Sequence, residues 1–402
     1  MQSPVNVKEP RQPLMVASDG VLYGLNEDGG DSEGGVLYAY DPATNTFSIL
    51  YEFASAVDGD RPQGELVEVG NKLYGTCFNG GAFDEGVLFS WDLTTSTYTV
   101  EHSFDPAVTY EPEPNLTLTS DGTLLGATND GGDNTVGTIY EFDPSTGTFT
   151  SYASFDFFST GYSTIYQFLE VSPGVFYGMN QNGGGSFDGT LYKFDRSANT
   201  ITVVHTFVGG NNDGSGGEGQ LTLSPDGLIY GTTVSGGPNN SGTIFSYDES
   251  TDTYMMLASF ASGSIPGFPF GPLYIGDDQK VYGTSTRGGG SNNGNIFAYD
   301  IGTGTLGIVA DDPILFNEPE SGLTYVPDIY LPEAICQDAT IDICGTLEGF
   351  YTPNDVNGGS RDNSSALFLG LATDSISVAT TLSSNTDDYF ANGELYYYEQ
   401  GT

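Results

Sequence analysis

The chain has 402 residues, of which 53 are acidic and only 9 are basic, giving a formal net charge of −44. This charge argues against nucleic acid and anionic membrane surfaces as partners, because both are bound through Lys and Arg. The chain has no run of 18 apolar residues, so we expect no membrane insertion.

The chain opens with a polar segment, residues 1–11, that lacks the apolar core of a signal peptide. After it, one short block recurs six times in the same register. The block reads Gly, four residues, Gly-Gly, four residues, Gly, and then an Asp six positions later. Successive blocks are 51, 51, 52, 53 and 52 residues apart, and they begin at Gly24, Gly75, Gly126, Gly178, Gly231 and Gly283. A constant period of this length is typical of a repeat architecture.

Each repeat has the pattern of four short β-strands joined by turns, here called strands a to d. In the second repeat we expect strands over 65–69, 72–76, 87–91 and 97–104. One such sheet cannot bury both faces alone, so neighbouring sheets must stack. Four-stranded units stacked around an axis form a β-propeller. The sequence therefore predicts an all-β fold, a six-bladed β-propeller of four-stranded antiparallel blades over residues 12–327.

Closure of the predicted ring involves both ends of the repeat region. Leu14–Ala17 is expected to be strand a of the first blade, and strand d of the sixth is expected to end near Phe316. Gly322–Val326 then has the pattern of one further strand a, which either pairs at the seam or leads into the tail. Seven blades would need three more strands, which the sequence does not show.

The recurring residues are expected to be structural, because catalytic sites are not sixfold. The first Gly lies within strand b, where glycine is expected if another backbone comes close. The Gly-Gly pair supplies positive φ angles in the b–c loop. The Asp suits the first position of a type I turn, as in Asp41-Pro42-Ala43-Thr44.

Variation between the repeats falls mainly in the d–a connections, which should share one face of the propeller with the b–c loops. Loops on a rigid scaffold are where function concentrates. The face formed by the d–a and b–c loops is therefore our hypothesis for the recognition surface, and the alternative is that its aromatic residues cap the core. The candidate ligand-binding residues are Tyr110, Phe157, Phe158, Tyr162, Tyr166, Phe268 and Phe270. Aromatic rings beside carboxylates suit a glycan or a polar protein surface.

Carboxylates in two loops are candidate calcium ligands, because Ca²⁺ prefers hard oxygen donors. They are Asp28, Asp31, Glu33, Asp58 and Asp60. No EF-hand pattern accompanies them, and later b–c loops lack carboxylates, so calcium in every blade is not expected.

The three cysteines and two histidines offer little chemistry. Cys77 is expected to be a packed thiol, whereas Cys336 and Cys344 are close enough in sequence for a local disulfide. His102 and His205 occupy equivalent positions two residues before the Phe that ends strand d, which indicates a scaffold role.

The repeat resembles a known family. The run Leu-Tyr-Gly-Thr-x-x-x-Gly-Gly followed by Gly-Thr-Ile-Phe-x-Tyr-Asp is similar to the Gloeo-Verruco (GloVer) tandem repeat, and residues 228–245 are the nearest copy. Leu125 replaces Tyr in the third repeat, and Asn295 replaces Thr in the sixth. The resemblance implies propeller blades in proteins secreted by bacteria, many from Bacteroidota, often by type IX secretion. It implies no catalytic residues.

The tail, residues 328–402, has a different pattern. Its segments 334–341 and 354–363 resemble the hyalin-repeat-like, immunoglobulin-type modules of large Bacteroidota surface adhesins. Those modules usually follow Asp-Asn with Cys, whereas here Ser364 follows, so we expect an incomplete module that lacks the usual disulfide. The resemblance implies a small β-sandwich-like module and a place in a larger multi-domain chain or surface assembly.

The sequence thus predicts a secreted or cell-surface adhesion module, located on the outer face of a Gram-negative cell, that binds an extracellular glycan or a surface protein. It predicts that the chain is not an enzyme, since neither a His-dependent site nor a Gly-x-Ser-x-Gly elbow occurs. The alternatives are a carbohydrate-active enzyme, such as a lyase or a carboxylate-based glycosidase, and a structural component of a surface or secretion complex.

Overall fold

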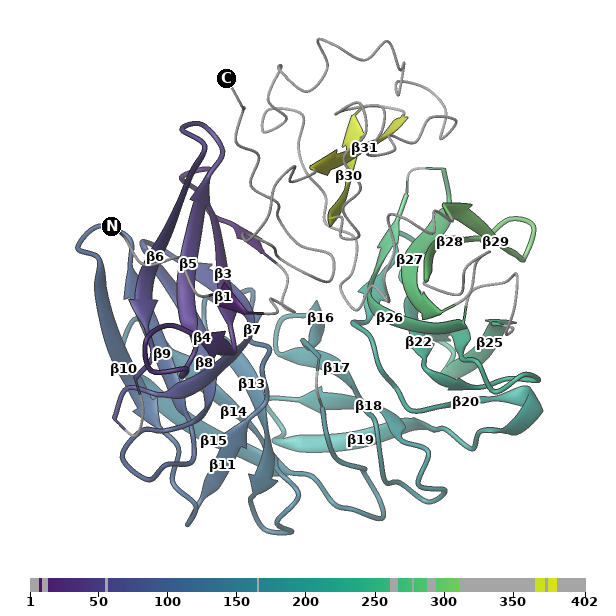
Figure 1. Ribbon diagram of the computed structural model, residues 1–402. Coiled ribbons are helices and arrows are strands. Elements are labelled where there is room, and N and C mark those ends of the chain that lie inside the picture. The colour runs from purple at the N-terminus through teal and green to yellow at the C-terminus, as the bar shows by residue number, and fades with distance from the viewer. Residues whose placement is uncertain are drawn as a thin grey trace, which may run out of the picture.

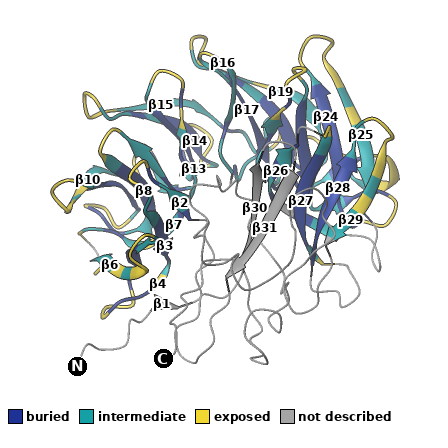
Figure 2. Cartoon of the chain, turned by 90° about the horizontal axis from the view of Figure 1, so that it is seen from above, coloured by how far each residue is buried: buried dark blue, intermediate teal, exposed yellow. Residues whose placement is uncertain are grey.

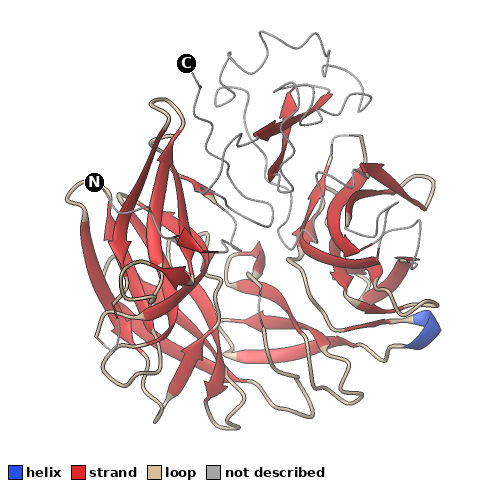
Figure 3. Ribbon diagram, in the orientation of Figure 1, coloured by secondary structure: helices blue, strands red, loops and turns tan. Residues whose placement is uncertain are grey.

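A computed structural model describes residues 14–54, 57–164, 166–260, 267–276, 278–287 and 294–310. Of 7–8, 366–372, 375–381 and residues 270 and 310 it describes the backbone alone. The described chain consists of β-strands and turns, with one short 3-10 helix, η1 (Gly210–Asn212) (Figure 3). The predicted all-β class is confirmed.

Six antiparallel sheets follow one another along the described chain, and in each sheet the strands a to d pair in chain order. The first sheet contains β2 (Met15–Val16), β3 (Leu22–Asn26), β5 (Val36–Asp41) and β6 (Thr46–Glu52). The second contains β7 (Asp60–Val69), β8 (Lys72–Asn79), β9 (Val87–Asp92) and β10 (Thr97–Ser103). The third contains β12 (Thr117–Leu118), β13 (Leu124–Gly131), β14 (Thr138–Asp143) and β15 (Thr148–Ser154).

The second half of the described chain repeats this arrangement. The fourth sheet contains β16 (Leu169–Ser172), β17 (Val175–Asn180), β18 (Thr190–Asp195) and β19 (Thr200–Thr206). The fifth contains β21 (Thr222–Leu223), β22 (Ile229–Thr233), β24 (Thr243–Asp248) and β25 (Thr253–Ser259). The sixth contains β26 (Gly267–Ile275), β27 (Lys280–Arg287), β28 (Asn295–Asp300) and β29 (Thr305–Ala310). The four-stranded antiparallel units predicted from the repeats are confirmed.

Short additional strands join the loops of one end of the sheets. β1 (Val7–Lys8) pairs with β4 (Asp28–Gly29), β11 (Thr109–Pro112) pairs with β13, and β20 (Gly214–Ser215) pairs with β23 (Ser235–Gly236). Each of these pairs ties the segment that leads into strand a to the end of strand b or the b–c loop. A separate hairpin, β30 (Ala366–Ala372) and β31 (Ser375–Thr381), lies in the tail.

The sheets follow one another in an arc, with the first on the left and the sixth on the right of Figure 1. Apolar side chains of consecutive sheets pack face to face, and Figure 2 shows the buried residues concentrated along the middle strands b and c. Between the first two sheets, for example, Leu25 and Phe53 pack with Leu73 and Phe89. Burying one such side chain contributes about 1.5–3 kcal/mol, so these interfaces hold neighbouring sheets together.

The Phe that ends strand d recurs at the same place in each interface. Its backbone N–H donates to the carbonyl of the last Gly of the repeat block at 2.9–3.1 Å, and its ring is fully buried. This residue is Phe53, Phe104, Phe155, Phe207 and Phe260 in the first five sheets. The interaction fixes the b–c loop over the end of strand d.

The recurring glycines are needed for two different physical reasons. The Gly-Gly pairs have positive φ wherever they are described, as predicted. The first Gly of each block does not have a positive φ, and what approaches it is a ring rather than a backbone. A Cβ at Gly231 would lie 2.4 Å from the Phe245 ring of the neighbouring strand c, and Gly126 meets the Tyr140 ring at the same distance. The predicted close approach occurs, but its cause is the aromatic residue of strand c.

The scaffold roles predicted for the Asp and the histidines agree with the contacts. Asp41 accepts a hydrogen bond from the N–H of Ala43 at 2.8 Å and from the Thr44 hydroxyl at 2.7 Å, which closes the c–d turn. His102 and His205 stack on rings of the following sheet, Phe149 at 3.7 Å and Tyr254 at 3.5 Å between ring centroids.

Some predictions concern other parts of the chain. Cys77 is a free, fully buried thiol, as expected. The Cys336–Cys344 disulfide, the strand at Gly322–Val326 and the hyalin-like pattern of residues 328–402 lie outside the described residues, and of that tail only the backbone of β30 and β31 is described. The sequence-based domain boundaries stay predictions. No helix in the described residues meets the length and hydropathy needed to cross a membrane.

Candidate functional site

The d–a connections and the b–c loops meet at one end of the sheets, as predicted. Each described connection has a residue with positive φ five positions before the buried Leu or Phe of strand a: these residues are Arg61, Glu111, Ser163, Gly216 and Phe268. In four of these connections its N–H donates to the b–c loop of the preceding sheet, as from Arg61 to the Gly34 carbonyl at 3.0 Å and from Phe268 to the Ser241 carbonyl at 2.8 Å. Backbone hydrogen bonds therefore fix the loops of this face.

Four aromatic rings gather on this face over the fourth sheet. Phe157, Phe158 and Tyr162 come from the connection between β15 and β16, and Phe187 comes from the loop between β17 and β18. Phe157 stacks on Tyr162 with centroids 5.0 Å apart and lies 5.1 Å from Phe158 and 5.7 Å from Phe187. Phe158 and Phe187 are 67% and 55% exposed. We call these four residues the aromatic platform.

The platform is held by the backbone beneath it. Tyr162 N–H donates to the Asn182 carbonyl at 2.9 Å, and Gly184 N–H donates to the Phe157 carbonyl at 3.1 Å. A Cβ at Gly183 would lie 2.6 Å from that same carbonyl, so glycine is required for the close approach of the two loops. Because the rings are positioned before any ligand arrives, little conformational entropy remains to be lost on binding.

Phe187 was not predicted from the sequence, although its backbone marks it. Its φ is +67°, and the equivalent residues of other b–c loops also have positive φ: Glu33, Asp84, Thr135 and Asn240. A bulky residue in this region is an outlier and its strain points to function. The sequence feature that could have indicated Phe187 is an aromatic residue two positions before Gly189, the last Gly of its block.

The other predicted aromatic residues do not join the platform. Tyr110 lies on β11 and packs against the core between the second and third sheets. Tyr166 is half-buried just before β16. Phe268 lies on β26 of the sixth sheet, with the Arg287 guanidinium 5.6 Å from its ring centroid. The side chain of Phe270 is outside the described residues.

The predicted calcium ligands are not brought together. Asp28 lies on β4, while Asp31 and Glu33 are exposed in the first b–c loop. Asp58 accepts a hydrogen bond from the Tyr51 hydroxyl at 2.6 Å, and burial raises the pKa of Asp60. In the described part of the chain, no three His, Cys, Asp or Glu side chains lie close enough to hold a metal ion.

A second group of polar residues lies where the inner strands of several sheets converge. The Gln167 amide of the fourth sheet donates to Glu65 of the second at 3.3 Å, and the Gln220 amide of the fifth donates to Gln167 at 2.7 Å. The first of these bonds joins the second and fourth sheets, which are not adjacent in sequence, so the inner strands approach a common centre. We call Glu65, Gln167 and Gln220 the axial cluster.

Glu113 is a perturbed carboxyl group two residues before Asn115, whose side-chain oxygen accepts a hydrogen bond from the N–H of Glu65 at 3.3 Å. Burial raises the pKa of Glu113 to about 8, and the charge of Glu111 adds to the shift. Burial also raises the pKa of Glu65, opposed by the hydrogen bond from Gln167. Burial raises the pKa values of Tyr140 and Tyr192, and the negative charge of Glu113 adds to both shifts.

The sequence interpretation missed the axial cluster, although a signal exists. In four successive repeats, a polar residue precedes the buried Leu or Phe of strand a. These polar residues are Glu65, Asn115, Gln167 and Gln220. A polar position at the same place in the innermost strand of successive sheets indicates a polar axis.

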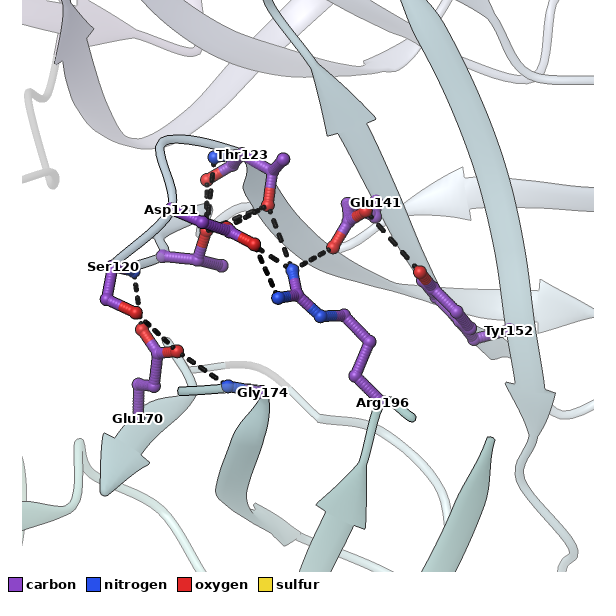
Figure 4. A network of polar contacts seen from close by, with 9 residues as sticks. Ser120, Asp121, Thr123, Glu141, Tyr152, Glu170, Gly174 and Arg196 are labelled. Atoms are coloured by element: carbon purple, nitrogen blue, oxygen red, sulfur yellow. Dashed lines mark hydrogen bonds and ion pairs between the residues drawn. The ribbon is translucent and has the colours of Figure 1, made fainter. Parts of the chain in front are cut away.

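A third network of polar groups joins the third and fourth sheets (Figure 4). The Arg196 guanidinium donates to Asp121 Oδ2 at 2.5 Å and to Glu141 Oε2 at 2.7 Å. Beside it, Glu170 accepts hydrogen bonds from the N–H of Ser120 at 2.6 Å and from the Ser120 hydroxyl at 3.0 Å. Both terminal nitrogens of Arg196 and both oxygens of the Glu170 carboxylate have protein partners, so we interpret this network as a connection between sheets rather than a ligand site.

Comparison with known proteins identifies the repeat. The family model of the Gloeobacter/Verrucomicrobia repeat matches residues 2–170 and 156–326. The chain belongs to this repeat family. Among curated proteins, none matches the chain.

Solved structures similar to this member of the family have propeller-like folds. An oligogalacturonate lyase in complex with manganese matches with a TM-score of 0.50 and 16% identity, over 76% of this chain and 78% of the lyase. The extracellular domain of the B. thetaiotaomicron protein BT4673 matches with a TM-score of 0.51 and 13% identity, over 80% of this chain and 36% of that one. A puromycin hydrolase variant matches with a TM-score of 0.50 and 12% identity, over 78% and 48%. Identities this low show the fold alone.

These comparisons correct one expectation. The sequence predicted that the chain is not an enzyme, but two of these three structures are of enzymes, a lyase and a hydrolase. The lack of a serine elbow or a histidine site is therefore not a reason to exclude catalysis, because the fold also carries enzymes.

Proposed function

We propose that this chain is the six-bladed propeller of a secreted or cell-surface protein and that its aromatic platform binds an extracellular glycan. The observation that carries the proposal is the platform itself: four clustered rings, two of them more than half exposed, fixed by backbone hydrogen bonds between two loops. Exposed apolar patches on a soluble protein mark interaction sites.

The surroundings of the platform favour a glycan over an apolar partner. The same two loops carry polar side chains, including Ser159, Asn182 and Asp188. Aromatic faces stack on the C–H groups of a sugar ring, while polar neighbours bond its hydroxyls. The net charge of −44 disfavours an acidic polysaccharide, so we expect a neutral or basic glycan.

The strained backbone of Phe187 supports a functional reason for this ring. Replacing it with Asn, a residue that tolerates positive φ, should leave the fold intact or stabilise it by about 1 kcal/mol. If Phe187 served only the stability of the fold, Phe187→Asn would instead destabilise the protein.

A glycan array probed with the whole protein tests the proposal. We expect binding by the wild type, loss of at least about tenfold in affinity for Phe158→Ala and for Phe187→Asn, and no change for Phe83→Ala. Phe83 is the matched control, because it is 50% exposed in the equivalent loop of the second sheet and no described ring lies beside it.

The array result is read together with a product assay on each bound glycan. Binding that survives both platform substitutions would contradict the proposed surface. Binding of proteins but of no glycan would identify the partner as a protein surface instead. Release of sugar products would show that the protein cleaves the glycan, and enzymes with propeller-like folds are known.

A further inference from the structure

The loops around the aromatic platform are acidic, which bears on the kind of glycan that the platform binds. The loops of this face from the third to the fifth sheet contain no Lys or Arg, and all but the last contain Asp. They are residues 130–137, 156–163, 181–189, 208–216 and 235–242. A ligand on the platform therefore meets negative charge, which repels an anionic group and attracts a cationic one.

Asp156 lies at the base of the connection that carries three of the four rings. Its Oδ1 accepts hydrogen bonds from the N–H of Phe158 at 3.1 Å, from the N–H of Ser159 at 2.8 Å and from the Ser159 hydroxyl at 2.8 Å. The hydrogen bonds from Ser159 and Phe158 lower the pKa of Asp156, so its carboxyl group is ionised at neutral pH. No described residue donates a hydrogen bond to its Oδ2, so this oxygen remains available to a ligand.

Asp188 provides a second carboxylate, on the loop that carries Phe187. Its backbone forms a β-bridge with Gly183, and a Cβ at Gly183 would lie 3.1 Å from the Tyr162 ring. Asp188 Oδ1 accepts a hydrogen bond from the Ser215 hydroxyl at 2.6 Å, whereas Oδ2 receives none from the part of the chain that the structure describes. Each of the two loops that form the platform thus carries one carboxylate with a free oxygen.

The cations of the fourth sheet do not compensate these carboxylates. Lys193 pairs with Glu249, and Arg196 pairs with Asp121 and Glu141. A positively charged group on the ligand would compensate the charge beside the platform instead.

We propose that the platform binds its glycan through a protonated amino group, as on an amino sugar that is not N-acetylated. The exposed rings of Phe158 and Phe187, whose centroids are 6.2 Å apart, attract a cation as well as the C–H groups of a sugar ring. The three N–H donors of an ammonium group suit the free carboxylate oxygens, and a charged donor strengthens these bonds. The proposal rests on the proposed function and adds the class of sugar to it.

Calorimetric titration of the whole protein tests the proposal with two probes of equal length, an oligomer of glucosamine and an oligomer of N-acetylglucosamine. Slightly acidic buffer keeps the amino groups protonated, and about 0.15 M salt screens diffuse attraction to the acidic surface. We expect the wild type to bind the glucosamine oligomer on the order of tenfold more tightly than the acetylated one. Phe158→Ala should weaken binding of the glucosamine oligomer by a similar factor.

Three charge variants separate the platform carboxylates from the general acidity of the protein. Asp156→Asn and Asp188→Asn keep an oxygen acceptor for the Phe158 N–H and the Ser215 hydroxyl but remove the charge. Each should reduce the preference for glucosamine by about threefold or more. Asp84→Asn is the matched control, because it removes the same charge from the equivalent loop of the second sheet, and it should keep the preference.

The outcomes distinguish failure of this proposal from failure of the proposed function. Equal affinity of the wild type for the two oligomers, or an equal loss of preference in Asp84→Asn, would overturn the role of the amino group. The same holds if the platform binds other neutral glycans of the array but neither oligomer. If no glycan binds at all, the proposed function fails and the amino-group proposal fails with it.

Discussion

At the scale of single residues, each repeat contains a pair of residues, a glycine on strand b and an aromatic residue on strand c, whose shapes depend on each other. Each glycine of strand b faces an aromatic ring of strand c, as Gly231 faces Phe245. The ring fills the space that a Cβ would take, so it packs into the core and shields the backbone of strand b. This pairing explains why glycine, a poor strand former, stands inside a strand.

Gly231→Ala should destabilise the protein by about 1–3 kcal/mol, because the added Cβ overpacks against the Phe245 ring. Gly307→Ala is the matched control, since Gly307 also lies in a strand without a positive φ but has open space around its Cβ position. We expect the control to change stability by less than about 0.5 kcal/mol. Equal losses in urea denaturation would refute the steric explanation.

Glu113 should make stability depend on pH in a defined direction. Its pKa is about 8 in the folded chain and 4.5 when unperturbed, so the folded chain retains a proton that the unfolded chain has released. Stability therefore falls as pH rises from about 4.5 to about 8. Glu113→Gln removes this loss, so its advantage over the wild type should be small at pH 4 and largest above pH 8.

The measurement is thermal unfolding of the wild type, Glu113→Gln and Asp84→Asn across this pH range. A constant difference between the wild type and Glu113→Gln would show that the Glu113 carboxyl group is not perturbed. The change in stability of Asp84→Asn measures the effect of removing one exposed negative charge from a strongly acidic protein, and it is subtracted from the change in Glu113→Gln.

At the scale of the strands and loops, the contacts between sheets differ in chemistry while the sheets themselves are alike. Apolar packing and the buried Phe at the end of strand d occur at successive interfaces. The interface of the third and fourth sheets adds the Arg196 network, in which one guanidinium joins the carboxylates of Asp121, in the turn before β13, and Glu141, on β14. Planar, charge-assisted hydrogen bonds of this kind stabilise the interface and also restrict its geometry.

Arg196→Met should cost about 1–2 kcal/mol, because Asp121 and Glu141 lose their charged partner while the apolar stem is kept. Arg196→Lys should recover only part of the loss, since an ammonium group does not span both carboxylates in the same plane. Lys280→Met, which removes an exposed pair with Asp278, should change stability by about 0.5 kcal/mol or less. Chemical denaturation compares the three variants, and full recovery by Lys would contradict the role of the guanidinium plane.

At the scale of the whole molecule, the strands could be predicted because period, alternation and glycine spacing all point to the same sheets. The platform could be predicted only in part. Phe157, Phe158 and Tyr162 stand together in one connection, whereas Phe187 lies in another loop at a position where the backbone favours Asn. The axial cluster was missed because its members are single polar residues from three different sheets, and only the convergence of the inner strands brings them together. The candidate calcium ligands come from two loops, and the described residues do not bring three of them together as a metal site.

Hydrogen–deuterium exchange of the whole protein, with and without a glycan that binds it, tests the central claim most directly. The account predicts added protection in residues 156–163 and 181–188, the two loops that carry the aromatic platform, and unchanged exchange in the equivalent loop at 79–86. Protection confined to other loops, with no change in the two loops of the fourth sheet, would contradict it.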